Sequence, residues 1–178
     1  LFYLVVKSDT INRFMIYSLD NVKKEPLVNR IKSLFSVNHN LVVNGLSSYV
    51  MPHDYSAFKE FKQLVDEIHL ILPKYKIVDM WFNIYTKGGY VKKHNHTSES
   101  TSKNSWLCGV YNLHKPLNSG DFYLNDNKIE AQEGDFFTFL PEDNHYTTEN
   151  QNNDIRIVIS FNFMKEISEF PGDDFPSK

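Results

Sequence analysis

The chain has 178 residues, a mass of 20.9 kDa and a formal net charge of −3, with 41% hydrophobic and 23% charged residues. This length suits one domain with a core of its own, and 15% aromatic residues exclude a disordered chain. The slightly acidic charge excludes the basic surface that binds nucleic acid or an anionic membrane, so neither partner is expected. The single cysteine excludes a disulfide framework, and we expect a cytoplasmic protein.

Residues 1–75 are expected to hold an N-terminal strand and two supporting helices. The stretch Leu1–Val6 is apolar but short, and it lacks basic residues and a small-residue cleavage site. A plain edge strand is therefore expected there, and neither a signal peptide nor a membrane span. Helical spacing of apolar residues predicts one helix over Leu27–Phe35 and a stronger one over Tyr55–Leu72, with Asp54 as the N-cap of the second.

Short strands follow, because the hydrophobic period changes from 3.6 to 2 residues beyond Lys76. Turn signals rich in Gly, Pro and Asn separate them. The expected strands are Ile77–Tyr85, Tyr90–His94, Trp106–Leu113, Asp121–Leu124, Lys128–Ala131, Asp135–Phe139, His145–Glu149 and Ile155–Phe163. Even spacing of this kind is typical of a two-sheet sandwich or jelly roll. We predict a single, mainly β domain over 1–178, with a core at 76–165, flanking helices and a polar tail at 166–178.

Two histidines, His94 and His96, lie two residues apart near the end of an expected strand. Residues at this spacing point to the same face of a strand, so their imidazoles can lie side by side. Imidazole is the commonest side-chain ligand for iron, zinc and copper. The pair is a weak signal by itself, since the chain has seven histidines and two exposed rings on an edge strand would look the same.

A third histidine, His145, follows an apolar strand that is bracketed by Gly134 and Pro141. A strand that ends in Pro-x-x-x-His can place its imidazole at the mouth of a barrel. A histidine in a surface turn is the alternative interpretation of the same pattern.

Arg156 is one of only three arginines, and it interrupts an apolar strand that should be buried, with Ser160 on the same face. A buried guanidinium needs an anionic partner, and its planar fork suits two-point binding of a carboxylate. An internal Asp or Glu could be that partner. Alternatively, the side chain could reach solvent from an edge strand.

Together, these motifs resemble the iron(II)/2-oxoglutarate-dependent dioxygenase superfamily, specifically its prolyl-hydroxylase-like branch. The resemblance runs from Trp81 to Asn162, and its order and spacing are more specific than any one motif. The motifs are Trp81-Phe-Asn83-Ile-Tyr85, Gly88-Gly89, His94-x-His96, Leu107-Cys-Gly-Val-Tyr111, Ser119-Gly120, Pro141, His145 and Arg156. Members of that family fold as a double-stranded β-helix, a cupin-like jelly roll. They hold iron with His-x-Asp/Glu and a distal His, and they anchor 2-oxoglutarate with a basic residue.

The resemblance assigns site residues position by position. They are His94 as the proximal ligand, His145 as the distal ligand, Arg156 as the partner of the remote carboxylate of 2-oxoglutarate, and Tyr85, Tyr111 and Ser160 as lining residues of the cosubstrate pocket. The implied cofactors are Fe(II) and 2-oxoglutarate. The implied activity is hydroxylation of an unidentified small-molecule or peptide substrate, with succinate and CO2 as coproducts. A homodimer is one candidate for the oligomeric state.

One departure from the family pattern concerns the metal. The family carboxylate is expected at position 96, where this chain has His96. We expect His96 to be the third ligand. Glu99, three residues further on, is an alternative, and a fold without functional iron is another.

Two rival functions also stay open. One is a cupin-like metal enzyme without 2-oxoglutarate, either a three-His dioxygenase or a sugar-phosphate isomerase. The other is a non-enzymatic β-sandwich binding module. Arg156 favours the oxygenase, because neither rival requires a buried arginine on that strand. The polar stretch Thr97–Ser105 is a candidate lid or an ordinary surface connection.

Overall fold

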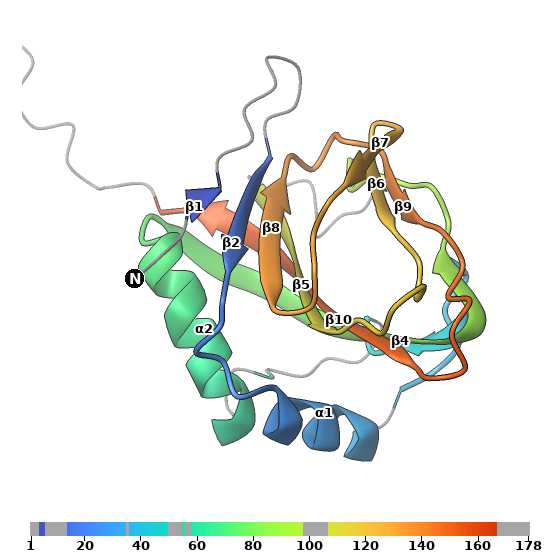
Figure 1. Ribbon diagram of the computed structural model, residues 1–178. Coiled ribbons are helices and arrows are strands. Elements are labelled where there is room, and N and C mark those ends of the chain that lie inside the picture. The colour runs from blue at the N-terminus through green and yellow to red at the C-terminus, as the bar shows by residue number, and fades with distance from the viewer. Residues whose placement is uncertain are drawn as a thin grey trace, which may run out of the picture.

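The computed structural model in Figure 1 describes residues 4–5, 14–34, 36–49, 55, 58–97 and 107–166. The elements in chain order are β1 (Leu4–Val5), β2 (Met15–Ser18), α1 (Lys24–Ser33), β3 (Val42–Ser47), α2 (Lys59–Ile71), β4 (Tyr75–Val91), β5 (Leu107–His114), β6 (Phe122–Leu124), β7 (Asn127–Ile129), β8 (Asp135–Phe139), β9 (His145–Thr147) and β10 (Arg156–Lys165). Neither of these two helices is long and apolar enough to cross a membrane.

The strands of the described residues form two antiparallel sheets (Figure 1). The larger sheet has the order β1-β2-β8-β5-β10-β4-β3, and the smaller has the order β7-β6-β9. The chain passes from the larger to the smaller sheet after β4, where His94 pairs with His145 in an antiparallel bridge. Two facing sheets joined in this way form the predicted jelly roll, the double-stranded β-helix.

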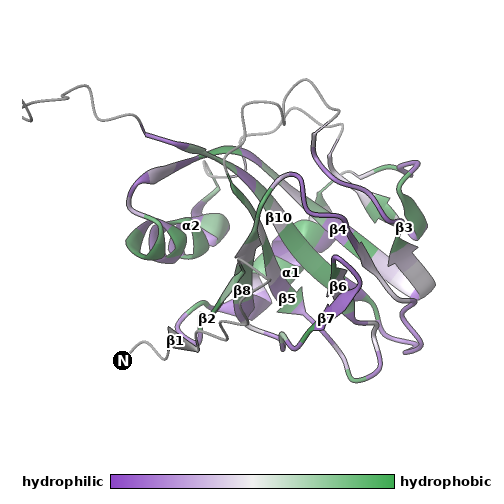
Figure 2. Cartoon of the chain, turned by 90° about the horizontal axis from the view of Figure 1, so that it is seen from above, coloured by the Kyte–Doolittle hydropathy of each residue, from purple (hydrophilic) through white to green (hydrophobic). Residues whose placement is uncertain are grey.

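The larger sheet is buried on both faces, and this explains its composition. Strand β10, which lies between β5 and β4, is buried over its first eight residues, and five of these eight are apolar (Figure 2). On one face, Leu27 of α1 and Phe61 of α2 pack against β-strand residues such as Phe136 and Ile159. On the other face, between the sheets, a second core forms around Val110, Phe122, Phe137, Phe139 and Val158. The helices therefore cover the outside of the larger sheet, as predicted.

Helix α2 begins at Lys59, four residues later than predicted. Phe58 occupies the N-cap position without a side-chain capping bond, and Asp54, the expected cap, lies outside the described residues. Tyr55 is instead a core residue, because its ring is 1% exposed and lies 5.7 Å from Phe61 and 5.6 Å from Phe82, measured between ring centroids. Its aromatic packing outweighs the helical spacing that the sequence suggested.

Strand β4 runs without interruption through the Gly88-Gly89 pair, where the sequence predicted a turn between two strands. Gly88 has a φ of 74°, and the register of β3 with β4 shifts at this point, where Asn44 has a φ of 45°. The backbone of Asn150 also pairs with both glycines, at 2.7 and 2.8 Å. The pair therefore forms a bulge. A bulge, like a turn, uses a glycine with a positive φ, but the strand stays paired with its neighbours.

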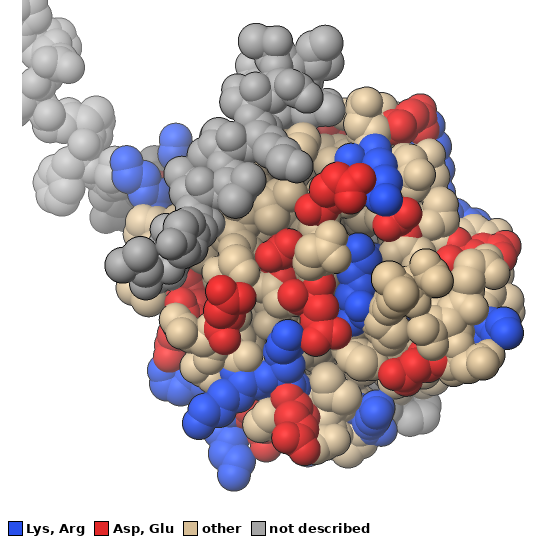
Figure 3. Space-filling model, viewed as in Figure 1, with Lys and Arg blue, Asp and Glu red and all other residues tan. Residues whose placement is uncertain are grey.

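Over the face shown in Figure 3, lysine and arginine side chains lie next to aspartate and glutamate. Ion pairs form at the protein surface, such as Lys24 with Glu133 at 2.9 Å and Lys93 with Asp126 at 2.7 Å. Exposed pairs of this kind contribute little to stability. The fold is therefore stabilised mainly by its two apolar cores.

The packing of β5 against side chains of its neighbouring strands β8 and β10 leads to a first prediction. A Cβ atom at Gly109 would lie 2.7 Å from Cε2 of Phe136 and 2.9 Å from Cε2 of Phe163. Gly109→Ala should therefore lower the free energy of unfolding by about 1–3 kcal/mol, as overpacking does, measured by urea unfolding. In a Phe136→Leu background the same change should cost less, because the nearest ring atoms are gone. Equal costs in both backgrounds would contradict this packing.

Candidate metal and anion-binding site

Backbone pairing brings three histidines together at one end of the barrel. The backbones of His94 and His145 exchange hydrogen bonds of 3.1 and 2.8 Å, and the N–H of His96 donates to the carbonyl of Pro141 at 2.8 Å. The ring centroids of His94 and His145 are 4.2 Å apart, and His96 lies 5.5 and 5.1 Å from these two. One potential ligand atom from each of the three residues lies within 4.8 Å of the others.

Each of the three rings donates its Nδ1–H to an oxygen atom of the protein. The acceptors are the backbone oxygen of Lys92 for His94 (2.8 Å), the backbone oxygen of Asp143 for His145 (3.1 Å) and the side-chain oxygen of Asn162 for His96 (3.0 Å). A carbonyl oxygen only accepts, so the proton of each neutral ring lies on Nδ1 and the lone pair on Nε2. Three oriented imidazole donors of this kind fit iron(II), zinc or another divalent transition metal.

His145 is the most deeply buried of the three, and its electrostatics suit a ligand. Burial lowers the pKa of its imidazole well below the ordinary value of 6.5, and the neighbouring rings of His94 and His96 lower it further. The ring is therefore neutral at neutral pH. A neutral imidazole is the form that binds metal, so His145 needs to lose no proton there.

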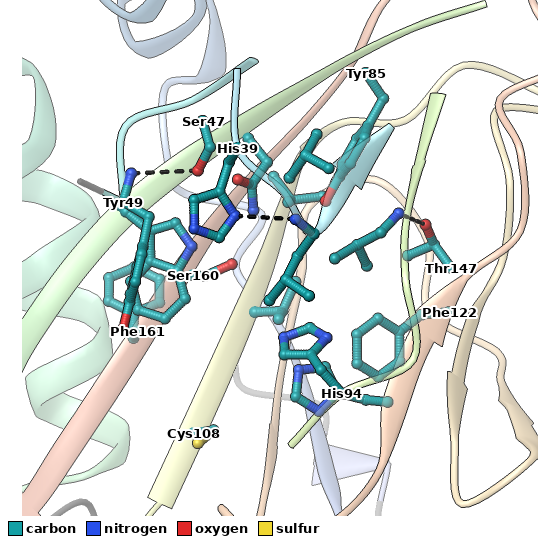
Figure 4. A pocket seen from close by; sticks show the side chains of 18 of the residues that line it. His39, Ser47, Tyr49, Tyr85, His94, Cys108, Phe122, Thr147, Ser160 and Phe161 are labelled. Atoms are coloured by element: carbon teal, nitrogen blue, oxygen red, sulfur yellow. Dashed lines mark hydrogen bonds between the residues drawn. The ribbon is translucent and has the colours of Figure 1, made fainter. Parts of the chain in front are cut away.

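The three histidines open onto a cavity of about 680 Å³ between the sheets, measured with its open mouth. Figure 4 shows side chains from both sheets converging on it, with His94 and Phe122 at one end and His39 and Tyr49 at the other. Among the described residues that line it, Arg156 is the only one with a permanent charge. The cavity therefore combines a potential metal site with one fixed cation.

Arg156 is 1% exposed, and its partners are all neutral. Its guanidinium donates to the carbonyl oxygen of Gly120 at 3.2 Å and to the side-chain oxygen of Asn112 at 3.4 Å. Its Nε atom is buried without a hydrogen-bond partner, and Cζ lies 5.7 Å from the ring centroid of Tyr85. No carboxylate in the described part of the chain forms an ion pair with it. The charge of Asp121 acts on it only from beyond ion-pair distance. A buried guanidinium without a carboxylate in contact is costly, and an anionic ligand would compensate it.

Tyr85 and Ser160 line this cavity together with Arg156. Burial raises the pKa of Tyr85 to about 12, although Arg156 and a hydrogen bond from Asn83 oppose the shift. Its phenol is therefore protonated and can donate a hydrogen bond to an anion. Ser160 is 7% exposed and lies on the same face of β10 as Arg156.

Tyr111, the third residue expected in the cosubstrate pocket, does not line the cavity. Successive residues of a strand point to opposite faces. Cys108 and Val110 of β5 face the cavity, so Tyr111 faces the helices and joins the core that contains Phe136. The structure therefore places Tyr111 in this core and not in the cavity that Arg156 lines. Glu99, the alternative ligand, lies outside the described residues.

The opposite faces of Tyr85 and Tyr111 predict different effects of removing each hydroxyl group. For an anion bound at Arg156, with 2-oxoglutarate as the one to test, Tyr85→Phe should weaken binding, because Tyr85 lines the cavity together with Arg156. Tyr111→Phe should leave that affinity unchanged and should cost the fold little, since its buried hydroxyl has no hydrogen-bond partner in the described part of the chain. Calorimetric titration of both variants checks this, and a weaker affinity in Tyr111→Phe would contradict the assignment.

The sequence analysis missed several residues of the cavity. Asn83 has the same strand parity as Tyr85, and this signal could have identified it. His39 and Tyr49 flank strand β3, which was not predicted because Asn44 and Gly45 interrupt its apolar pattern. The ring of Tyr49 lies edge-on to Trp81 at 5.0 Å, so an aromatic wall forms one side of the cavity.

No protein-family model matches this sequence, and no curated protein matches it. Several solved structures share its fold. A prolyl hydroxylase from Trichoplax adhaerens, in complex with a hypoxia inducible factor oxygen degradation domain peptide fragment, is 14% identical with a TM-score of 0.66, and the match covers 88% of this chain and 85% of that chain. HygX from Streptomyces hygroscopicus, with nickel and 2-oxoglutarate bound, is 12% identical with a TM-score of 0.68, over 88% of this chain and 84% of that chain.

A third similar structure is the viral collagen prolyl hydroxylase of Paramecium Bursaria Chlorella virus-1 in its 2OG complex. It is 14% identical with a TM-score of 0.63, and the match covers 89% of this chain and 98% of that chain. At such low identity the likeness extends to the fold. The chain therefore has the double-stranded β-helix fold of the 2OG-Fe(II) oxygenases and prolyl hydroxylases.

Proposed function

We propose that the chain is an iron(II)- and 2-oxoglutarate-dependent oxygenase that hydroxylates its substrate. In this proposal His94, His96 and His145 hold the metal, and Arg156 binds the remote carboxylate of 2-oxoglutarate. One observation carries it: a buried guanidinium without a protein carboxylate lines the same cavity as three oriented imidazoles. A neutral ligand would leave that guanidinium without an anion in contact, whereas a dicarboxylate offers one carboxylate to the metal and another to the arginine.

The residues of the cavity suit each part of this cosubstrate. Arg156 presents a fork that matches a carboxylate, and the hydroxyl groups of Tyr85 and Ser160 lie on the same side of the cavity. Apolar side chains such as Phe122 and Val158 line other parts of the cavity. The chain thus supplies binding and orientation in a partly apolar environment, in which charge interactions are stronger than in water.

Iron(II), 2-oxoglutarate and O2 supply hydroxylation of a C–H bond, with one oxygen atom in the product and the other in the succinate left by loss of CO2. The surface that the chain offers to the substrate is the aromatic wall formed by His39, Tyr49 and Trp81. A flat aromatic wall suits an apolar or ring-bearing group. Among the similar structures, one is in complex with a peptide fragment and another contains hygromycin B, so a peptide and a small molecule both remain candidate substrates.

Anaerobic titration tests the proposal directly. Iron(II) added to the protein should give a weak visible charge-transfer band only when 2-oxoglutarate is also present, because the band requires both on one metal. Succinate in place of 2-oxoglutarate is the control, since it keeps the remote carboxylate but lacks the keto group. The proposal fails if iron(II) does not bind, or if 2-oxoglutarate changes neither the spectrum nor the iron affinity.

A cupin-like metal enzyme without 2-oxoglutarate is a second candidate, and His96 is the observation that favours it. With His96 in place of the family carboxylate, the three proposed ligands are all neutral. Such a site carries one more positive charge than a site with two His and one carboxylate. The same titration separates the two functions: iron(II) would bind, and 2-oxoglutarate would have no effect. Arg156 argues for the first candidate.

A further inference from the structure

A row of polar residues crosses the apolar larger sheet next to His96. Asp79 of β4, Asn162 of β10 and Cys108 of β5 are direct cross-strand neighbours, because Asn162 pairs with Asp79 on one side and with Cys108 on the other. Asn162 is fully buried, and Cys108 is 1% exposed. A buried amide in an apolar strand is costly unless its polar atoms are hydrogen-bonded, so its contacts identify what it does.

Asn162 connects Asp79 to His96. Its Nδ2 donates to Oδ2 of Asp79 at 3.2 Å, and its Oδ1 accepts from Nδ1 of His96 at 3.0 Å. The thiol of Cys108 donates to the same Oδ1 at 3.4 Å, and its Sγ atom also lies 3.4 Å from Nδ1 of His96. A carboxylate oxygen only accepts, so Asp79 determines which way the amide of Asn162 is oriented. The amide oxygen then faces His96 and requires the proton on Nδ1.

His96 differs in this respect from the other two histidines. Backbone carbonyls orient the rings of His94 and His145, whereas side chains orient His96. His96 also stands where the family pattern has a carboxylate. A carboxylate can bind metal through either oxygen, but a neutral imidazole with its proton on Nε2 cannot bind through that atom. Replacing a carboxylate with histidine at this position therefore creates a need for tautomer control.

We propose that Asp79 and Asn162 are positioning residues that hold His96 in the tautomer with its lone pair on Nε2, and so make it a metal ligand. The inference rests on the metal site of the proposed function. Asp79 acts through Asn162, and Asn162 acts through His96, so neither residue contacts the metal. Outer partners of this kind typically change metal affinity by about 10- to 100-fold when they are removed.

The first measurement needs no metal. Long-range ¹H–¹⁵N correlation spectra of the metal-free protein report which nitrogen of each imidazole carries the proton. His96 should be protonated on Nδ1 in the unchanged protein and should lose this preference in Asn162→Leu, which removes the acceptor. His94 and His145 are internal controls, because their backbone acceptors are unaffected.

The second measurement is the zinc(II) affinity, obtained by competition with a chromophoric chelator. Asn162→Leu should weaken zinc(II) binding by about 10- to 100-fold. Asp79→Asn should give a smaller loss, because the amide of Asn162 remains but its orientation is no longer determined. The double variant Asp79→Asn/Asn162→Asp should recover the affinity, since the carboxylate then accepts directly from His96 and the new amide supports it. Asp66→Asn on α2 removes the same charge from an exposed Lys62 ion pair and should have no effect.

The results separate this inference from the proposed function. An unchanged His96 tautomer and unchanged zinc(II) affinity in Asn162→Leu would overturn the positioning role. If that variant does not fold, the double variant decides: His96 protonated on Nδ1 supports the role, and any other tautomer overturns it. If the unchanged protein binds neither zinc(II) nor iron(II), the proposed function fails, and the tautomer measured without metal still tests the pair.

Discussion

Replacing Arg156 with lysine should weaken 2-oxoglutarate binding by about 10- to 100-fold, because a hydrogen bond to a charged group contributes about 1.5–3 kcal/mol and 1.4 kcal/mol is tenfold. Lysine keeps the charge but cannot supply the two-point fork. The loss of cosubstrate affinity should exceed the loss of stability, since the guanidinium has only neutral protein partners to lose. Titration of 2-oxoglutarate into the zinc(II)-loaded protein gives the affinity, and thermal unfolding gives the stability.

Arg30→Lys is the matched control for this prediction. Arg30 lies on α1, where its guanidinium stacks over the ring of Phe58 at 4.1 Å, away from the cavity. It should change stability slightly and leave 2-oxoglutarate affinity as it is. If Arg156→Lys also leaves the affinity unchanged while zinc(II) still binds, Arg156 is not the cosubstrate anchor.

The second large effect concerns pH and the third histidine. Imidazole binds metal only when neutral, and its ordinary pKa is about 6.5. Apparent iron(II) affinity should therefore fall as the pH drops from about 7.5 to 5.5, because protons compete with the metal for the histidines. His96→Asp should flatten this dependence by about one proton, since a carboxylate is already ionised in this range. Iron(II) affinity measured anaerobically across the range for both proteins checks this. Coinciding pH slopes of iron(II) affinity for His96→Asp and the unchanged protein would show that His96 is not a ligand.

His145 contributes little to that competition, and its effect appears in stability instead. Its pKa in the folded protein lies well below 6.5, so below pH 6.5 the unfolded chain binds a proton that the folded protein does not. In the metal-free protein, the contribution of neutral His145 to the free energy of unfolding is therefore fully present above about pH 6.5. It declines as the pH falls from there toward the lower pKa of the folded state. His145→Gln should lose this part of the acid sensitivity in urea unfolding.

Much of the fold follows from local patterns along the chain. The change of hydrophobic period beyond Lys76 identified most of the strands from β4 to β10, because burial on a sheet repeats every two residues whatever the partner strand is. The stripe on α2 identified its buried face in the same way. Arg156 was recognised because a cation inside an apolar strand conflicts with that pattern and so requires a partner.

Local patterns do not decide which signals act as turns or which face of a strand meets the cavity. The Gly88-Gly89 pair allows both a turn and a bulge, and pairing with β3 and with Asn150 selects the bulge. Tyr111 lies in a strand that is buried on both sides, so its sequence does not alternate between apolar and polar residues. The sequence therefore does not show which face Tyr111 occupies. The parity became clear only when the neighbours of β5 were known.

The candidate site itself depends on contacts between distant parts of the chain. His94 and His145 meet because two segments pair across the sheets, and that register comes from the whole barrel rather than from either segment. The absence of a protein carboxylate beside Arg156, within the described residues, is equally a result of packing. Residue types and their spacing along the chain thus determined the candidate ligands. Only long-range strand pairing decided that they share one cavity, and that Asn162 and Asp79 lie next to His96.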